Sequence, residues 1–241
     1  MVARTFACTA ALVCVTMISP SRAEPRAVIE LFTSQGCSSC PPADKVLGEF
    51  AANPAILAMT MAIDYWDYLG WKDTLALPGH TRRQKAYAHA RHDREVYTPQ
   101  AVVNGTAHVL GSDKAAIERA IAQSKSAEAL ALPVTLAVAA SEFVVTVAGG
   151  ASEAGEVWLC PMTKAVSVEI GRGENNGRTV TYHNVVRQWI KIGDWTGKGE
   201  TWRVPLAKLT ANQVDRVAVL VQRGVTANPG MMLGAATASL K

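Results

Sequence analysis

The sequence predicts an α/β domain that is followed by a small, antiparallel β-sandwich-like domain. Up to about residue 128, apolar strand-like segments alternate with helical segments, a pattern typical of mixed α/β folds. After Leu132 the segments become short and alternate polar with apolar residues, which is typical of antiparallel sheets. The change of pattern lies near residues 126–133 and predicts two domains, 24–128 and 129–241.

Residues 1–23 have the features of an export signal. Arg4 supplies the positive start, residues 6–18 carry no charge, and Ser21 and Ala23 are the small residues that a signal peptidase requires. The apolar stretch is too short to span a bilayer as a helix. We therefore expect cleavage after Ala23 and a periplasmic or secreted protein.

The charge of the chain does not favour nucleic acid or a membrane surface as a partner. The formal net charge is +4, and it falls to +2 when Arg4 and Arg22 are removed with the signal segment. A charge this small and this dispersed excludes the basic patch that either partner needs.

The first domain is expected to contain the order strand, helix, strand, helix, strand, strand, helix. An aromatic-rich insertion at 64–80 follows the second strand, and Asn104-Gly105 is the signal of a type I′ hairpin turn. This order is that of the thioredoxin fold. The expected strands are 27–33, 56–63, 101–103 and 107–110, and the expected helices are 40–52, 81–94 and 114–125.

The second domain is expected to contain only short strands separated by turn residues. Their number and spacing predict an antiparallel sandwich or barrel. The expected strands are 134–138, 143–147, 156–160, 165–170, 178–189, 200–204, 215–222 and 231–238.

Cys37 and Cys40 form a Cys-x-x-Cys motif at the start of the first predicted helix. The N-terminus of a helix carries partial positive charge, which stabilises a thiolate and lowers its pKa. The second cysteine lies one helical turn further on and can attack a mixed disulfide. This arrangement predicts Cys37 as the nucleophile and Cys40 as the resolving residue.

Two other roles of the cysteine pair stay open at this point. Zinc or copper(I) would need further Cys or His ligands, and the histidines show no ligand spacing, so no metal ligand is assigned. A purely structural disulfide would constrain the unfolded chain little, because its loop is so short. The remaining cysteine of the mature chain, Cys160, is expected to be a buried small hydrophobe.

Thr98-Pro99 precedes the third predicted strand. In thioredoxin-like folds a cis proline at this place faces the cysteine pair, so we expect Pro99 to be cis and to belong to the catalytic site. The alternative is an ordinary trans proline that opens a strand. Thr98 would offer its backbone groups to an extended substrate.

The aromatic insertion is expected at the end of the sheet that carries the cysteines. Asp64, Tyr65 and Trp66 are therefore candidate substrate-binding residues. The alternative is a small satellite core that covers the insertion.

Residues 30–44, ELFTSQGCSSCPPAD, resemble the signature of an uncharacterised family of secreted bacterial proteins. Residues 64–71, DYWDYLGW, and 97–100, YTPQ, are also similar to its pattern. That family is catalogued as a domain of unknown function with a thioredoxin-like fold. The resemblance implies the fold and export, and it implies no settled activity.

Glu30 is a candidate for proton transfer. Working thioredoxins carry a buried acid on the first strand that takes a proton from the second cysteine. Glu30 lies near that place, although the loop to Cys37 is one residue longer. The alternative role is an edge carboxylate or a structural ion pair.

These observations predict an exported thiol–disulfide oxidoreductase that acts on an exported protein or a small thiol, with a redox partner protein and without a cofactor. The alternative is a non-catalytic binding module for a peptide or a metal ion, copper or zinc. The reactivity of Cys37 distinguishes the two, because an enzyme needs a thiol that substrates can reach.

Overall fold

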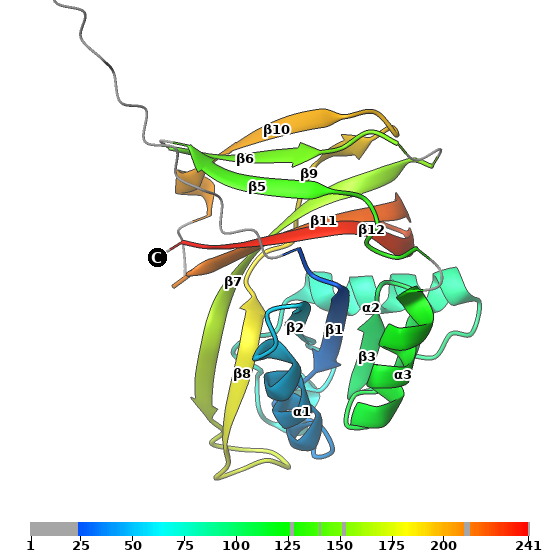
Figure 1. Ribbon diagram of the computed structural model, residues 1–241. Coiled ribbons are helices and arrows are strands. Elements are labelled where there is room, and N and C mark those ends of the chain that lie inside the picture. Colours follow the sequence, from blue (N-terminus) through cyan, green and yellow to red (C-terminus); the bar gives the residue numbers. More distant parts are fainter. Residues whose placement is uncertain (1–23, 126–127, 140, 151–152, 210–212, 241) are drawn as a thin grey trace, which may run out of the picture.

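A computed structural model describes residues 24–125, 128–139, 141–150, 153–209 and 213–240 (Figure 1). The chain forms a mixed α/β structure with a large sheet and a second, small antiparallel sheet. The predicted signal segment and its cleavage site lie outside the described residues and stay predictions. No helix in the described part of the chain is long and apolar enough to cross a membrane.

The order of elements predicted for the first half is confirmed. The second helix begins at Pro78 rather than at residue 81, because proline suits the first helical turn, and His92 ends it in the left-handed region. The elements are β1 (Ala27–Thr33), α1 (Pro41–Ala51), β2 (Ile56–Ala62), η1 (Asp67–Leu69), α2 (Pro78–Arg91), β3 (Gln100–Val103), β4 (Ala107–Leu110) and α3 (Lys114–Lys125).

The second half is built from strands, as predicted, with two differences. The predicted strands 156–160 and 165–170 are one strand, and a strand follows Trp189 that the sequence did not predict. The elements are β5 (Val134–Ala139), β6 (Glu142–Val147), β7 (Gly155–Glu169), β8 (Thr179–Val186), β9 (Ile190–Trp195), β10 (Glu200–Pro205), η2 (Leu206–Lys208), β11 (Arg216–Val225) and β12 (Asn228–Ser239).

Pro161 does not break β7 because of where it stands along the strand. On one side β7 pairs with β9 up to Leu159 and with β8 from Met162, so Pro161 faces the gap between these partners. Its carbonyl accepts the Arg187 N–H on that side. The missing N–H of proline therefore costs no ladder hydrogen bond.

The prediction that the two halves form separate sheets is wrong. The large sheet has nine strands in the order β12-β11-β7-β8-β2-β1-β3-β4, with β9 beside β7, and it contains strands from both halves. Only the small sheet, β10-β6-β5, is separate. The division into domains 24–128 and 129–241 stays a prediction.

The two halves join where β8 lies parallel to β2. The ladder contains one residue pair there, Thr60 with Val185. The Thr60 hydroxyl donates to the His183 carbonyl over 2.8 Å, and the Asn184 amide donates to the Ala58 carbonyl over 2.8 Å. A buried β2 with an open edge would leave backbone groups unsatisfied, which explains why β8 covers it.

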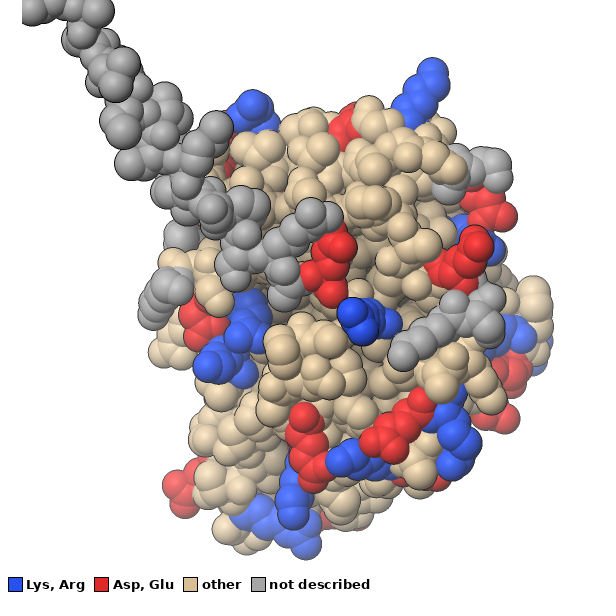
Figure 2. Space-filling view, in the orientation of Figure 1, with Lys and Arg blue, Asp and Glu red and all other residues tan. Residues whose placement is uncertain are grey.

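Helices cover both faces of the first half of the sheet (Figure 1). Alternate residues of β1 point to opposite faces, so Ile29 and Leu31 pack with residues of α1 and α3, and Val28 and Phe32 pack with Tyr87 of α2. The small sheet packs on β7, β11 and β12. On the face shown in Figure 2, basic and acidic side chains of the described residues are interspersed.

A buried ion pair connects β1, α2 and β11. Arg83 donates to both carboxylate oxygens of Glu30, at 2.5 and 3.0 Å, and to Gln222 of β11 at 2.9 Å. The guanidinium lies 3.9 Å from the ring centroid of Trp189. The Tyr87 hydroxyl donates to Glu30 over 2.5 Å. Every partner of Glu30 in this network lies on the α2 side of the sheet.

We predict that Arg83→Leu lowers the free energy of unfolding by about 3 kcal/mol, because it leaves the Glu30 carboxylate buried without a compensating charge. Urea denaturation measures the change. Arg82→Leu is the matched control, since Arg82 is the exposed neighbour on the same helix and its loss should cost less than about 0.5 kcal/mol. Equal losses in the two variants would contradict a structural role of the ion pair.

Candidate functional site

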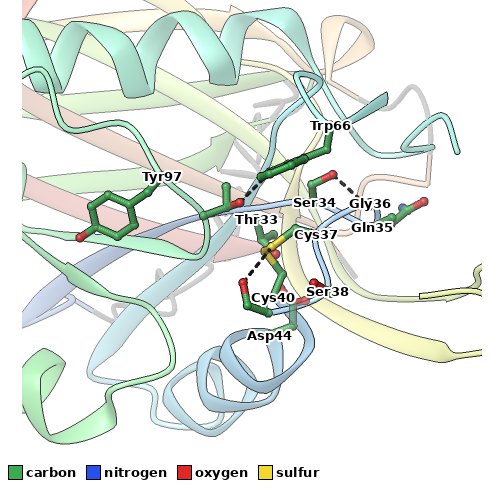
Figure 3. Close-up of a disulfide and its surroundings, with 12 residues drawn as sticks. Thr33, Ser34, Gln35, Gly36, Cys37, Ser38, Cys40, Asp44, Trp66 and Tyr97 are labelled. Atoms are coloured by element: carbon green, nitrogen blue, oxygen red, sulfur yellow. Dashed lines mark hydrogen bonds between the residues drawn. A yellow bond between two sulfur atoms is a disulfide. The ribbon is translucent and has the colours of Figure 1, made fainter. Parts of the chain in front are cut away.

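Cys37 and Cys40 form a disulfide at the start of α1, with their Cα atoms 5.4 Å apart (Figure 3). Cys40 is the N-cap of the helix, and its carbonyl accepts the N–H groups of Ala43 and Asp44. Cys37 is 3 % exposed and Cys40 is 0 % exposed, whereas the two serines between them are exposed. An incoming thiolate would therefore meet Cys37 before Cys40.

The loop that leads to the cysteines is held through Gln35. The Gln35 N–H donates to Asp73 over 2.8 Å, and its side-chain oxygen accepts the Trp71 indole N–H over 2.8 Å. The same side chain also bonds to Thr74. Asp73, Trp71 and Thr74 belong to the aromatic insertion, so the insertion positions the cysteine loop from one side.

Trp66 and Thr98, two of the predicted substrate-binding residues, lie together. The Trp66 indole N–H donates to the Thr98 hydroxyl over 2.7 Å. Trp66 also lies against the cysteine loop, because a Cβ atom on Gly36 would be 3.1 Å from the Cβ of Trp66. Tyr68 stacks on Trp66 and is 76 % exposed. Trp66 thus connects the cysteine loop to Thr98 and adjoins an exposed aromatic ring.

The Thr98–Pro99 peptide bond is cis, as predicted. The Pro99 carbonyl accepts the Gly111 N–H over 2.9 Å. A Cβ atom on Gly111 would lie 3.2 Å from the Cβ of Pro99 and 3.3 Å from the Cβ of Ala43. Pro99 therefore lies close to the first turn of α1, and its contact with the cysteines stays a prediction.

Asp64 and Tyr65 lie at the start of the insertion. Asp64 accepts the Thr81 hydroxyl over 2.5 Å and so ties the insertion to α2. Tyr65 is half-buried, and burial raises the pKa of its hydroxyl. Their role in substrate binding stays a prediction.

Glu30 and the cysteine pair lie on different faces of the sheet. Glu30 forms the ion pair with Arg83 on the face covered by α2, whereas Leu31 beside it packs toward α1. Of the two roles that the sequence left open for Glu30, the structure shows the ion pair. Proton transfer to Cys40 is not supported by this position.

Asp44 is a buried acid on the cysteine side that sequence reasoning missed. It lies on α1 one turn after Cys40, is 1 % exposed, and accepts the Thr33 hydroxyl over 2.8 Å. Among the described residues its second oxygen has no hydrogen-bond partner. Burial raises the pKa of Asp44 to about 8, the Thr33 hydrogen bond opposes this shift, and the Asp73 charge adds to it. The i, i+4 spacing from Cys40 was a signal in the sequence.

Residues far along the chain also contact the cysteine loop. The Asn175 side-chain amide donates to the carbonyls of Gln35 and Cys37, over 2.9 and 2.8 Å. The Glu174 carboxylate accepts the Ser38 N–H over 3.3 Å. Both residues lie in the connection between β7 and β8, and no local pattern linked them to the cysteines.

Cys160 is a free, fully buried cysteine of β7, as predicted, and burial raises the pKa of its thiol. Within the described ranges, no group of three or more His, Cys, Asp or Glu side chains is placed to hold a metal ion.

The fold and the site define a mixed α/β protein with a disulfide at a helix N-terminus. Residues 28–222 match the family described as "Protein of unknown function (DUF1223)", and the chain belongs to that family. Among curated proteins, none gives a match.

Two solved structures are similar to this chain. The crystal structure of protein AGR_C_4864 from Agrobacterium tumefaciens is 32% identical, with a TM-score of 0.80 over 88% of this chain and 93% of that chain. HBP35 of Porphyromonas gingivalis is 11% identical, with a TM-score of 0.60 over 92% of this chain and 76% of that chain. The second likeness shows the fold alone.

The raised pKa of Asp44 predicts that the folded protein loses stability as the pH rises from about 4 to about 8. Its folded-state pKa of about 8 lies above the ordinary 3.8, so the folded protein binds one more proton than the unfolded chain in this window. The free energy of unfolding therefore falls as the pH rises through this window. Asp44→Asn removes this contribution and keeps a partner for Thr33. We expect the free energy of unfolding of the oxidised variant, relative to that of the wild type, to increase as the pH rises. Urea denaturation measures this difference.

His80 contributes in the opposite direction. Burial lowers the pKa of His80 from 6.5 to about 4. The free energy of unfolding contributed by His80 therefore increases as the pH rises from about 4 to 6.5. The comparison of Asp44→Asn with the wild type at each pH cancels this contribution. A difference between the two proteins that does not change with pH would rule out the raised pKa of Asp44.

Proposed function

We propose that the protein is an exported thiol–disulfide oxidoreductase with a thioredoxin-like fold. The observation that carries the proposal is the Cys37–Cys40 pair at the N-terminus of α1, with the cis proline Pro99 close to the first turn of that helix. The helix N-terminus favours a thiolate at Cys37. Residues 1–23 support export to the periplasm or beyond.

The arrangement of the first half supports a thioredoxin-like fold. Strands β2, β1, β3 and β4 are adjacent in that order, with β1 parallel to β2 and antiparallel to β3. Helices α1 and α3 pack on one face and α2 packs on the other. A thioredoxin fold has this strand order and this distribution of helices.

In the oxidising direction, a substrate thiolate attacks the Sγ atom of Cys37. The bond between Cys37 and Cys40 breaks, a mixed disulfide forms on Cys37, and Cys40 leaves as a thiolate that takes up a proton. A second substrate thiolate then attacks the substrate sulfur of the mixed disulfide. The substrate leaves as a disulfide, Cys37 leaves as a thiolate, and two electrons have passed to the cysteine pair. Reduction of a substrate disulfide runs these steps in reverse.

Asp44 is the proton donor and acceptor for Cys40 in this proposal. Its N–H bonds to the Cys40 carbonyl over 3.1 Å, so the carboxyl lies within the same helical turn, and its second oxygen has no partner among the described residues. With a pKa of about 8, the carboxyl holds a proton near neutral pH and can exchange it with a thiolate.

The substrate would lie across Trp66, Tyr68 and Thr98. The Tyr68 ring is exposed and stacks on Trp66, and Trp66 adjoins both the cysteine loop and Thr98. An aromatic surface of this kind accepts an extended peptide whose backbone meets Thr98. We therefore propose an exported protein as the substrate, with a separate redox partner.

The alternative function is a binding module that keeps a permanent disulfide. The observation that favours it is the low exposure of Cys37, which is 3 %. In that case the aromatic surface would hold a peptide and the cysteines would serve only to stabilise the loop.

Substitution of the two cysteines distinguishes the functions. Cys40→Ser should trap a mixed disulfide through Cys37, because the resolving thiol is gone. Cys37→Ser should abolish exchange with a disulfide substrate. Both variants are expressed with residues 1–23 intact, and covalent complexes are measured on non-reducing gels. The control is the double variant Cys37→Ser/Cys40→Ser, which retains only the buried Cys160 within residues 24–241 and should form none.

If Cys40→Ser traps nothing, and Cys37 resists alkylation after mild reduction of the wild type, the binding module replaces the oxidoreductase. Uptake of one copper(I) or zinc ion per chain by the reduced pair, with both cysteines required, would instead support a metal-binding function.

A further inference from the structure

The connection between β7 and β8, residues 170–178, has a fixed shape of its own. Ile170 exchanges backbone hydrogen bonds with the end of the connection, accepting from Gly177 over 2.8 Å and donating to Arg178 over 2.9 Å. Gly173 and Gly177 both have a φ of 76°, which favours glycine. The Ile170 side chain is fully buried. The connection therefore presents its side chains in set positions.

Asn175 is the only buried side chain between Ile170 and Val180, and it faces the cysteine loop. It is 1 % exposed and donates to the carbonyls of Gln35 and Cys37. These carbonyls flank Gly36, so one amide group fixes the backbone on both sides of it. Within the described chain, the Asn175 side-chain oxygen has no hydrogen-bond partner. Among the described residues, the side-chain hydrogen bonds of Asn175 thus go to the cysteine loop alone.

Trp71 packs against the connection at Gly171 and Gly173. A Cβ atom on Gly171 would lie 3.2 Å from the Trp71 ring, and a Cβ atom on Gly173 would lie 3.5 Å from the Cβ of Trp71. Trp71 also donates to Gln35. The insertion, the connection and the cysteine loop therefore form one packed unit.

Glu174 brings a negative charge to the N-terminus of α1. Its carboxylate accepts the Ser38 N–H, one residue after Cys37. Other acidic groups near the loop are the buried Asp44 and Asp73, together with Asp67, which accepts the Asp73 N–H. Among the described residues, no Lys or Arg side chain forms a hydrogen bond or an ion pair with residues 34–40. A carboxylate here repels a Cys37 thiolate and occupies a donor that would stabilise it.

We propose that the 170–178 connection is a working part of the redox centre, in which Asn175 limits access to the disulfide and Glu174 disfavours the Cys37 thiolate. Both are positioning residues that act through the cysteine loop. The proposal rests on the proposed oxidoreductase function and assigns the control of its reactivity to the second half of the chain. The pair is consequently kept oxidised until a partner displaces the connection.

The first test measures access to the disulfide. The oxidised protein is treated with dithiothreitol, and the reduced fraction is followed by alkylation and mass measurement. Asn175→Ala removes two hydrogen bonds from the loop and should speed reduction about tenfold. The matched control is Asn176→Ala, because Asn176 is exposed and, among the described residues, the side-chain hydrogen bonds from this connection to the cysteine loop come from Glu174 and Asn175. This control should reduce at the wild-type rate.

Equal rates in Asn175→Ala and the wild type would overturn the role of Asn175, and so would an equal acceleration by Asn176→Ala. A wild-type disulfide that dithiothreitol cannot reduce would count against the oxidoreductase function. In that case the role of Asn175 is still testable, because Asn175→Ala should make the disulfide reducible by dithiothreitol.

The second test measures how the charge of Glu174 affects Cys37. Glu174 is exposed, so its substitution should not disturb folding. Glu174→Gln should lower the pH midpoint of Cys37 alkylation by about half a pH unit and shift the glutathione equilibrium about threefold toward the dithiol. The control is Glu169→Gln, which removes the same charge at the exposed end of β7. An unchanged midpoint in Glu174→Gln, or an equal shift in Glu169→Gln, would overturn the role of Glu174.

Discussion

The geometry of the cysteine site depends on the pairing of β8 with β2. A buried strand cannot leave one edge without hydrogen-bond partners, and β8 supplies them for β2. The contact is short, with one ladder pair and two side-chain hydrogen bonds, yet it fixes β8 beside α1. Gly48 of α1 allows this approach, because a Cβ atom there would lie 2.8 Å from the His183 ring. The connection that precedes β8 is thereby brought to the start of α1.

Glu30 and Asp44 are both buried acids of the first half, and they differ in their partners. Glu30 has the Arg83 guanidinium and the Tyr87 hydroxyl beside it, so its position is that of a structural ion pair between elements. Asp44 has one hydroxyl and no cation among its described contacts, so burial raises its pKa to about 8. A carboxyl that titrates near neutral pH next to a cysteine pair is suited to move protons, whereas a compensated carboxylate is suited to hold elements together.

Much of the local structure was predictable because its causes are local. The periodicity of apolar residues gave the strands and helices of the first half in the right order, and Asn104-Gly105 gave the hairpin between β3 and β4, with both residues at positive φ. The errors have non-local causes. Two strands, 156–160 and 165–170, were predicted, but β7 continues through Pro161 because its neighbours change at that residue. The halves were expected to form separate sheets, but strands of both are needed to cover β2.

The sequence by itself determined that two cysteines one helical turn apart lie at the start of α1, and that a cis proline precedes β3, because spacing and chain order are local properties. Only the tertiary structure decided which acids lie near the cysteines and which distant residues contact their loop. Glu30 faces away because β1 alternates its side chains between faces, and this can be resolved only when the helices on each face are known. Asn175 lies 138 residues beyond Cys37, and the contact exists because a sheet edge was paired across that distance.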